Sequence, residues 1–167
     1  LPDVVSGRIV NSEEYRRKDA FLVIFMCAHC PYVKHVEKEI ANIGLDFADE
    51  NIGIVAISSN YVEAYPDDAP EKLKEQAQRL GFNFAYLYDE SQKVARAYGA
   101  VCTPDFFLFD SDMKLAYRGQ LDASRPNNNV PVTGKDLRFA INSLLAGRVP
   151  PEDQKPSIGC NIKWKPR

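Results

Sequence analysis

Residues 20–57 constrain the fold most strongly, because their hydrophobic pattern changes twice. Residues 20–26 form an unbroken apolar run with valine, isoleucine and phenylalanine, which predicts a strand covered on both faces. After Pro31, apolar residues recur every three or four positions, as in an amphipathic helix: Val33, Val36, Ile40, Ile43 and Phe47. Residues 54–57 predict a second buried strand. A strand, a helix and a strand at this spacing form a βαβ unit, whose strands are parallel.

The rest of the chain continues this alternation. Asp68, Pro70 and Glu71 are typical of a helix start, and Gly81 of its end. A short apolar segment follows at 84–88. Further expected elements are a helix at 89–98, a hairpin of 105–109 and 114–118, and a helix at 133–146. This order predicts an α/β fold with a central mixed sheet flanked by helices. We expect a single domain over residues 1–167, with residues 149–167 as a tail packed on it.

Charge and hydropathy exclude two classes of partner. The net charge is −2, with 21 basic and 23 acidic residues interspersed, whereas nucleic-acid binding needs a concentrated basic face. The longest apolar run, residues 20–28, is far shorter than the roughly 20 residues of a membrane helix. We therefore expect no nucleic-acid or membrane partner, and a monomer in the cytoplasm. The chain begins with Leu1 rather than Met, so removal of a preceding segment stays open.

The residues richest in chemistry follow the first predicted strand, as Cys27-Ala28-His29-Cys30. Open α/β sheets place active sites at the carboxyl ends of their strands, and a helix N-terminus stabilises a thiolate. We expect Cys27 at the start of the helix, with Cys30 one turn further in. Two intervening residues let Cys30 resolve a mixed disulfide formed at Cys27. We therefore expect Cys27 to be the exposed nucleophile and Cys30 the buried resolving thiol. His29, when protonated, would stabilise the Cys27 thiolate.

Two other interpretations of this cysteine pair stay open. Cys27 and Cys30 could form a static disulfide, or half of a zinc site in a non-enzymatic or redox-regulated binding module. Structural zinc favours two close ligand pairs, and Cys102 and Cys160 stand far apart in the sequence. The redox interpretation is favoured, since a CxxC after a strand in a βαβ pattern is a redox signature. We expect no metal and no cofactor.

Four segments resemble the thioredoxin superfamily and, more closely, its peroxiredoxin-like branch with the alkyl hydroperoxide reductase/thiol-specific antioxidant type of domain. They are residues 25–36 (FMCAHCPYVKHV), 103–107 (TPDFF), 117–126 (YRGQLDASRP) and 158–164 (IGCNIKW). The resemblance implies a thioredoxin-like fold and an antioxidant oxidoreductase. Such an enzyme would exchange a disulfide with protein partners and with a thiol reductant or oxidant.

The resemblance also implies a cis-proline at Pro104 that faces the cysteine pair. Thr103, just before it, would then offer backbone groups to an extended substrate. The chemistry agrees, because X-Pro bonds adopt cis at low cost. The alternative is an ordinary trans proline that opens a strand.

Two positions depart from the family patterns. Thioredoxins carry a buried acid six residues before the first cysteine, where this chain has Phe21; proton transfer would then fall to His29 or water. Peroxiredoxins carry a proline and, three residues before the peroxidatic cysteine, Thr or Ser. If Cys30 aligns with that cysteine, Val23 and Cys27 occupy those places. A thiol peroxidase with Cys30 as attacking thiol is therefore the alternative function, not the leading one.

The remaining two cysteines are candidates for an additional redox role. Side chains alternate along an extended segment, so a Thr103 that faces the pair turns Cys102 away. We therefore expect Cys102 to be a packed free thiol. Cys160 lies in a tail too short for a core of its own, which must pack on the main body. A structural thiol and a second redox partner both stay open for Cys160.

Overall fold

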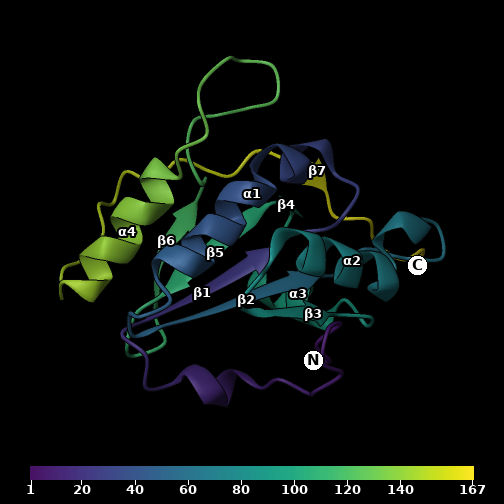
Figure 1. Cartoon of the computed structure of the whole chain (residues 1–167), viewed down its shortest axis with the longest axis horizontal. Coiled ribbons are helices and arrows are strands. Elements are labelled where there is room, and N and C mark those ends of the chain that lie inside the picture. The colour runs from purple at the N-terminus through teal and green to yellow at the C-terminus, as the bar shows by residue number, and fades with distance from the viewer.

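The computed structural model describes residues 1–167 and has a five-stranded sheet at its centre (Figure 1). Its strands are β1 (Ala20–Phe25), β2 (Ile52–Ser58), β3 (Ala85–Tyr88), β5 (Asp105–Phe109) and β6 (Leu115–Gly119). They lie in the order β3-β2-β1-β5-β6. The first three run parallel, whereas β5 is antiparallel to both β1 and β6. The sheet is therefore mixed, and the predicted βαβ unit is confirmed.

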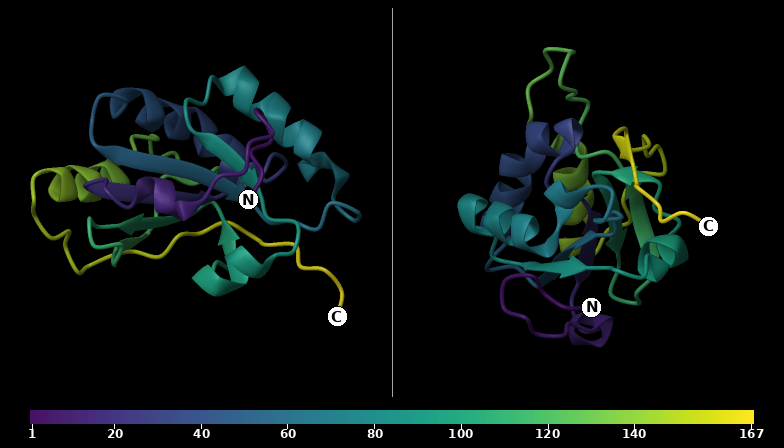
Figure 2. Two further views of the ribbon diagram at one scale, coloured as in Figure 1. Left: turned by 90° about the horizontal axis from the view of Figure 1, so that it is seen from below. Right: turned by 90° about the vertical axis from the view of Figure 1, so that its right-hand side faces the viewer.

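Helices cover both faces of this sheet. They are α1 (Pro31–Asp46), α2 (Pro70–Leu80), α3 (Lys93–Tyr98) and α4 (Lys135–Leu145), with 3-10 helices at Ser12–Tyr15 and Pro66–Asp68. α1, α2 and α4 pack on one face, and α3 lies on the other (Figure 2). None of the helices has the length and apolar character that crossing a membrane requires.

β1 occupies the centre of the sheet and is buried on both faces. Leu22 and Ile24 face the core under α1, α2 and α4, whereas Phe21 and Val23 face the core closed by α3. This two-sided burial explains why the β1 sequence is apolar without interruption.

The α3 helix is shorter than the sequence predicted. Asp89 was expected to begin it, but α3 begins at Lys93. The fully buried Asp89 carboxylate instead accepts the backbone N–H of Ala95 at 2.9 Å. Gln92, at φ 63°, turns the chain into the helix. Asp89 therefore lies before α3, and its side chain accepts a backbone N–H of the first turn that has no partner within the helix.

The C-terminal tail lies against the main body. β7 (Cys160–Asn161) pairs antiparallel with β4 (Cys102–Thr103) to form a second, two-stranded sheet. Ile162 is buried in the core on the α3 face. Figure 1 shows β7 beside the start of α1. The tail therefore reaches the segment that joins β1 to α1.

Candidate active site

The segment Cys27-Ala28-His29-Cys30 joins the end of β1 to the start of α1. α1 begins at Pro31, so Cys30 and not Cys27 caps its N-terminus. Proline suits the first helical position and disfavours helical backbone in the residue before it. Cys30 is accordingly extended, with φ −67° and ψ 127°. The expectation that the helix begins at Cys27 is therefore wrong.

Both thiols of the pair are shielded from solvent. Cys27 and Cys30 are free cysteines, and each has a relative exposure of 0%. The Cys27 sulfur lies 3.6 Å from the Thr103 hydroxyl, and the Cys30 sulfur lies 3.5 Å from the Thr103 carbonyl oxygen. Thr103 thus contacts both sulfurs. The prediction of an exposed Cys27 is wrong, because the cis-proline segment lies against it.

Neighbouring groups move the pKa values of the two thiols in opposite directions. The Cys27 thiol hydrogen-bonds to the Cys30 sulfur and lowers the pKa of Cys30; the Cys160 thiol and the Val33 N–H lower it further, against the effect of burial. The same bond with Cys30 raises the pKa of Cys27, as do burial and the nearby Asp68 carboxylate. The negative charge of the reduced pair therefore belongs on Cys30 at the N-terminus of α1.

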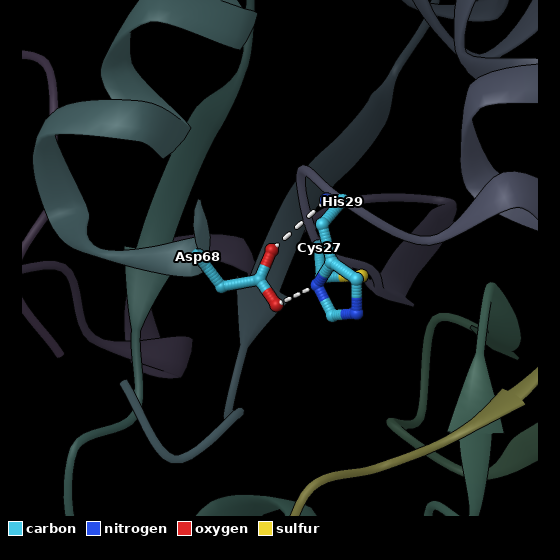
Figure 3. A group of neighbouring side chains, drawn as sticks. All are labelled: Cys27, His29 and Asp68. Atoms are coloured by element: carbon cyan, nitrogen blue, oxygen red, sulfur yellow. Dashed lines mark hydrogen bonds and ion pairs between the residues drawn. The ribbon is translucent and has the colours of Figure 1, made fainter. Parts of the chain in front are cut away.

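A buried carboxylate organises the backbone of this segment. Asp68 has a relative exposure of 0% and lies in the 3-10 helix that precedes α2. Its Oδ1 accepts the backbone N–H groups of Ala28 at 2.8 Å and of His29 at 3.0 Å. Its Oδ2 pairs with the His29 Nδ1 atom and accepts the Asn60 amide at 2.9 Å. Figure 3 shows the His29 imidazole between this carboxylate and Cys27.

The role of Asp68 was not predicted from the sequence. There Asp68 was interpreted as a residue at the start of a helix. α2 has Ala69 as its N-cap, without a side-chain cap. Asp68 is a buried acid beside Cys27, whereas Phe21, at the position of the thioredoxin acid, packs in the α3-side core. One signal was available: β2 is parallel to β1, so the loop after β2 leaves from the same sheet edge as Cys27.

The residues best placed to bind a metal are Cys27, His29 and Asp68. One ligand atom from each lies within 4.8 Å of the other two. Both Asp68 oxygens, however, already serve hydrogen bonds from the main chain, His29 and Asn60. A zinc site of the kind considered from the sequence would use both Cys27 and Cys30 as ligands. The three residues brought together here include Cys27 but not Cys30. The arrangement serves better as a hydrogen-bonded Cys–His–Asp series that can hold a proton near the Cys27 sulfur.

The Thr103–Pro104 peptide bond is cis, as the family resemblance implied. The backbone beside it is not open to an extended substrate, however. β4 pairs Thr103 with Cys160 of the tail. A Cβ atom added to Gly159 would lie 2.0 Å from the Thr103 carbonyl oxygen, so the two main chains are in close contact. The tail therefore occupies the place where a substrate strand was expected.

The other two cysteines lie on opposite sides of the β4–β7 pair. Cys102 is buried, and its thiol points to the carbonyl oxygens of Pro104 and Ser157, each at 3.8 Å. Burial raises the pKa of Cys102 to about 12, which suits a packed thiol. Cys160 is half-buried, and burial together with a hydrogen bond to Cys30 raises its pKa to about 11. The structure thus brings Cys160, and not Cys102, to the Cys27–Cys30 pair.

Comparison with known proteins agrees with this geometry. The model of the AhpC/TSA family matches residues 1–118. No functionally curated protein matches the chain. A crystal structure of an uncharacterized conserved protein from Geobacillus kaustophilus is 53% identical, with a TM-score of 0.98, over 100% of this chain and 88% of that one. A hypothetical protein from Sinorhizobium meliloti is 43% identical, with a TM-score of 0.96, over 99% and 90% of the two chains.

A more distant structure extends the likeness in fold. A thiol:disulfide interchange protein of the thioredoxin family from Chlorobium tepidum is 15% identical, with a TM-score of 0.66. The match covers 87% of this chain and 91% of that one. The fold is therefore thioredoxin-like, as the resemblance in the sequence implied.

Proposed function

We propose that this chain, which belongs to the AhpC/TSA family, is a thiol–disulfide oxidoreductase that exchanges a Cys27–Cys30 disulfide or dithiol with partner proteins. The observation that carries the proposal is the pair itself. Cys30 caps the N-terminus of α1 and Cys27 lies three residues before it; the pKa is lowered for Cys30 and raised for Cys27. One member is thus a ready thiolate, while the other holds its proton until it is needed.

The proposed reaction transfers two electrons. When the oxidised pair meets a partner dithiol, the Cys27–Cys30 bond breaks and a disulfide forms in the partner. Cys30 leaves as the thiolate that its surroundings stabilise. Cys27 takes up a proton, for which His29, with a ring nitrogen within 4.8 Å of the Cys27 sulfur, is the nearby donor. The reverse steps reduce a partner disulfide and return that proton to His29.

Asp68 is a positioning residue in this scheme. Its bond to Nδ1 fixes the orientation of the His29 ring, and its bonds to two main-chain N–H groups fix the turn that carries Cys27. A His ring held by a carboxylate on one nitrogen is free to move a proton at the other.

A thiol peroxidase is the second candidate function. The lowered pKa of Cys30 and the AhpC/TSA family both favour it. A peroxidatic thiolate also needs a preorganised donor for the departing oxygen. The Thr103 hydroxyl lies against the Cys27 sulfur at 3.6 Å, and Cys27 itself replaces the hydroxyl residue of peroxiredoxins. A thiol is a weak donor, so disulfide exchange remains the leading proposal.

We further propose that residues 1–167 form one domain, which acts as a monomer in the cytoplasm. The low net charge of −2, with both signs interspersed, supports partners other than nucleic acid. Size-exclusion chromatography coupled to light scattering tests the monomer. Cell fractionation with an antibody to the full chain tests the compartment.

Catalysed reduction of insulin by dithiothreitol tests the proposed function. The wild-type protein should accelerate precipitation of the insulin B chain, and Cys30→Ala should fall to the uncatalysed rate. Cys102→Ala is the matched control and should behave as wild type, because its sulfur faces away from the pair. A Cys30→Ala protein as active as wild type would refute the proposal.

A further inference from the structure

The tail presents Cys160 to the cysteine pair by the geometry of strand pairing. Residues directly opposite each other in an antiparallel pair project their side chains to the same face. Thr103 is opposite Cys160, and the Thr103 hydroxyl touches the Cys27 sulfur. Cys160 therefore projects toward the pair, whereas Cys102, the preceding residue of β4, projects away.

The position of the tail is fixed at several points around the site. Gly159 packs its backbone on the Thr103 carbonyl with no room for a side chain. Asn60 donates its amide to Asp68 and accepts the Lys163 N–H with its Oδ1, each at 2.9 Å. One residue thus bonds both to the tail and to the carboxylate that holds the Cys27–Cys30 turn. The placement of Cys160 is therefore coupled to the organisation of the pair.

Exposure separates the three thiols of this cluster. Cys27 and Cys30 have 0% relative exposure, whereas Cys160 is half-buried. Thr103 connects Cys160 to the pair: its carbonyl oxygen lies 3.5 Å from the Cys30 sulfur, and Cys160 is its partner across the β4–β7 ladder. A partner protein that meets the folded surface thus reaches Cys160 before it reaches the pair.

We propose that Cys160 is a third redox-active thiol, which forms a disulfide with Cys30 and carries exchange between the buried pair and partner thiols. This inference rests on the proposed function, since it supplies the route by which that same pair meets its partners. Every step needs only the oxidised pair and a partner dithiol.

The steps balance in atoms and electrons. The Cys160 thiolate attacks the Cys30 sulfur of the oxidised pair; the Cys30–Cys160 bond forms, the Cys27–Cys30 bond breaks, and Cys27 leaves and takes a proton from His29. A partner thiolate then attacks Cys160, and Cys30 leaves as a thiolate. The second partner thiol gives its proton to solvent and attacks the first partner sulfur; the partner disulfide forms, and Cys160 leaves as a thiolate. One disulfide is lost from the pair, one is gained by the partner, and Cys160 returns to its starting state.

The leaving groups favour the second step, in which the partner attacks Cys160. Expulsion of Cys27 in the first step depends on the proton that His29 supplies, because the pKa of Cys27 is raised. In thiol–disulfide exchange, a thiol of lower pKa leaves faster. Attack by a partner on Cys160 expels Cys30, whose pKa is lowered, and the half-buried position of Cys160 leaves that sulfur within reach. Attack on the pair itself would require the tail to move aside first.

Disulfide mapping in Cys27→Ser proteins tests the proposal. We compare Cys27→Ser/Cys102→Ser with Cys27→Ser/Cys160→Ser after oxidation with diamide, using non-reducing peptide mass spectrometry. The first should form a Cys30–Cys160 disulfide as its main product, and the second should keep Cys30 and Cys102 as thiols. The inference is overturned if Cys160 in the first protein stays fully alkylatable. Wild-type protein that fails to form Cys27–Cys30 would instead contradict the proposed function.

A rate measurement separates a redox role from a structural one. Cys160→Ser and Cys102→Ser are compared with wild type in the oxidation of a reduced, unfolded partner protein, with circular dichroism to confirm that each variant is folded. An intramolecular thiol acts at a millimolar effective concentration, so Cys160→Ser should slow this exchange by about tenfold or more. Cys102→Ser should leave the rate unchanged. Equal rates for wild type and a folded Cys160→Ser protein would overturn the inference.

Discussion

Replacing Cys27 by alanine in the reduced protein should raise the pKa of Cys30. The Cys27 thiol is the largest single cause of the lowered Cys30 pKa. A hydrogen bond to a charged group contributes about 1.5–3 kcal/mol. At about 1.36 kcal/mol per pKa unit, its loss should raise the pKa of Cys30 by about one to two units. Cys27→Ser keeps a donor at the same place and should give a smaller rise.

Carbon NMR of the Cys30 Cβ as a function of pH measures this change directly, because that shift reports thiolate formation without requiring access to the sulfur. Cys102→Ala serves as the control and should leave the curve unchanged, since the Cys102 thiol points to the carbonyl oxygens of Pro104 and Ser157. An unchanged Cys30 curve in Cys27→Ala would refute the reasoning. The reasoning would also be refuted if Cys27 formed a thiolate at low pH in a Cys30→Ala protein. The sequence had assigned the thiolate to Cys27.

Three further changes test other contacts of the site. Asp68→Asn should lower the free energy of unfolding by roughly 1.5–3 kcal/mol, measured by urea denaturation, because the new amide cannot accept from both His29 and Asn60; an equal stability would contradict the buried network. His29→Ala should slow disulfide exchange by about a hundredfold in stopped-flow assays if its ring moves the Cys27 proton, and an unchanged rate would remove His29 from the mechanism. Because the pKa of Cys30 is lower in the folded protein than in the unfolded chain, ionisation of Cys30 stabilises the fold. This contribution to the free energy of unfolding is complete above the unfolded thiol pKa of about 8.5 and is lost as pH falls toward the folded pKa. The reduced wild type should therefore gain more stability than Cys30→Ser from about pH 5 to about pH 8, and parallel curves would contradict the lowered pKa.

The parts of the fold that were predicted are those with a local pattern. The apolar run of β1 and the periodic stripe of α1 each carry their own signal, and both elements were confirmed. Pro31 likewise carries a local signal for the start of α1, which places Cys30 at the cap. The expected helix start at Cys27 was wrong, because Pro31 favours extended backbone in Cys30 and the helix begins only after it.

The parts that were missed depend on contacts between distant residues. Asp68 resembles any helix-start acid in sequence, and its burial against Ala28 and His29 follows from the packing of a loop. The β4–β7 pair has two residues in each strand, too few for a periodic pattern. Packing of the tail was predicted from its lack of a core, but its position over Thr103 was not. For that reason the role of Cys160 stayed open at the level of sequence.

The central claim is that the Cys27–Cys30 pair exchanges disulfides in preference to reducing peroxide. The most direct test is a pair of second-order rate constants for the reduced wild-type protein, one with a model mixed disulfide and one with hydrogen peroxide. We expect rapid exchange with the disulfide and a peroxide rate close to that of an ordinary thiol, since Cys27, a weak donor, stands where peroxiredoxins carry a hydroxyl residue. A peroxide rate that exceeds that of an ordinary thiol by orders of magnitude would contradict the claim and establish the peroxidase alternative.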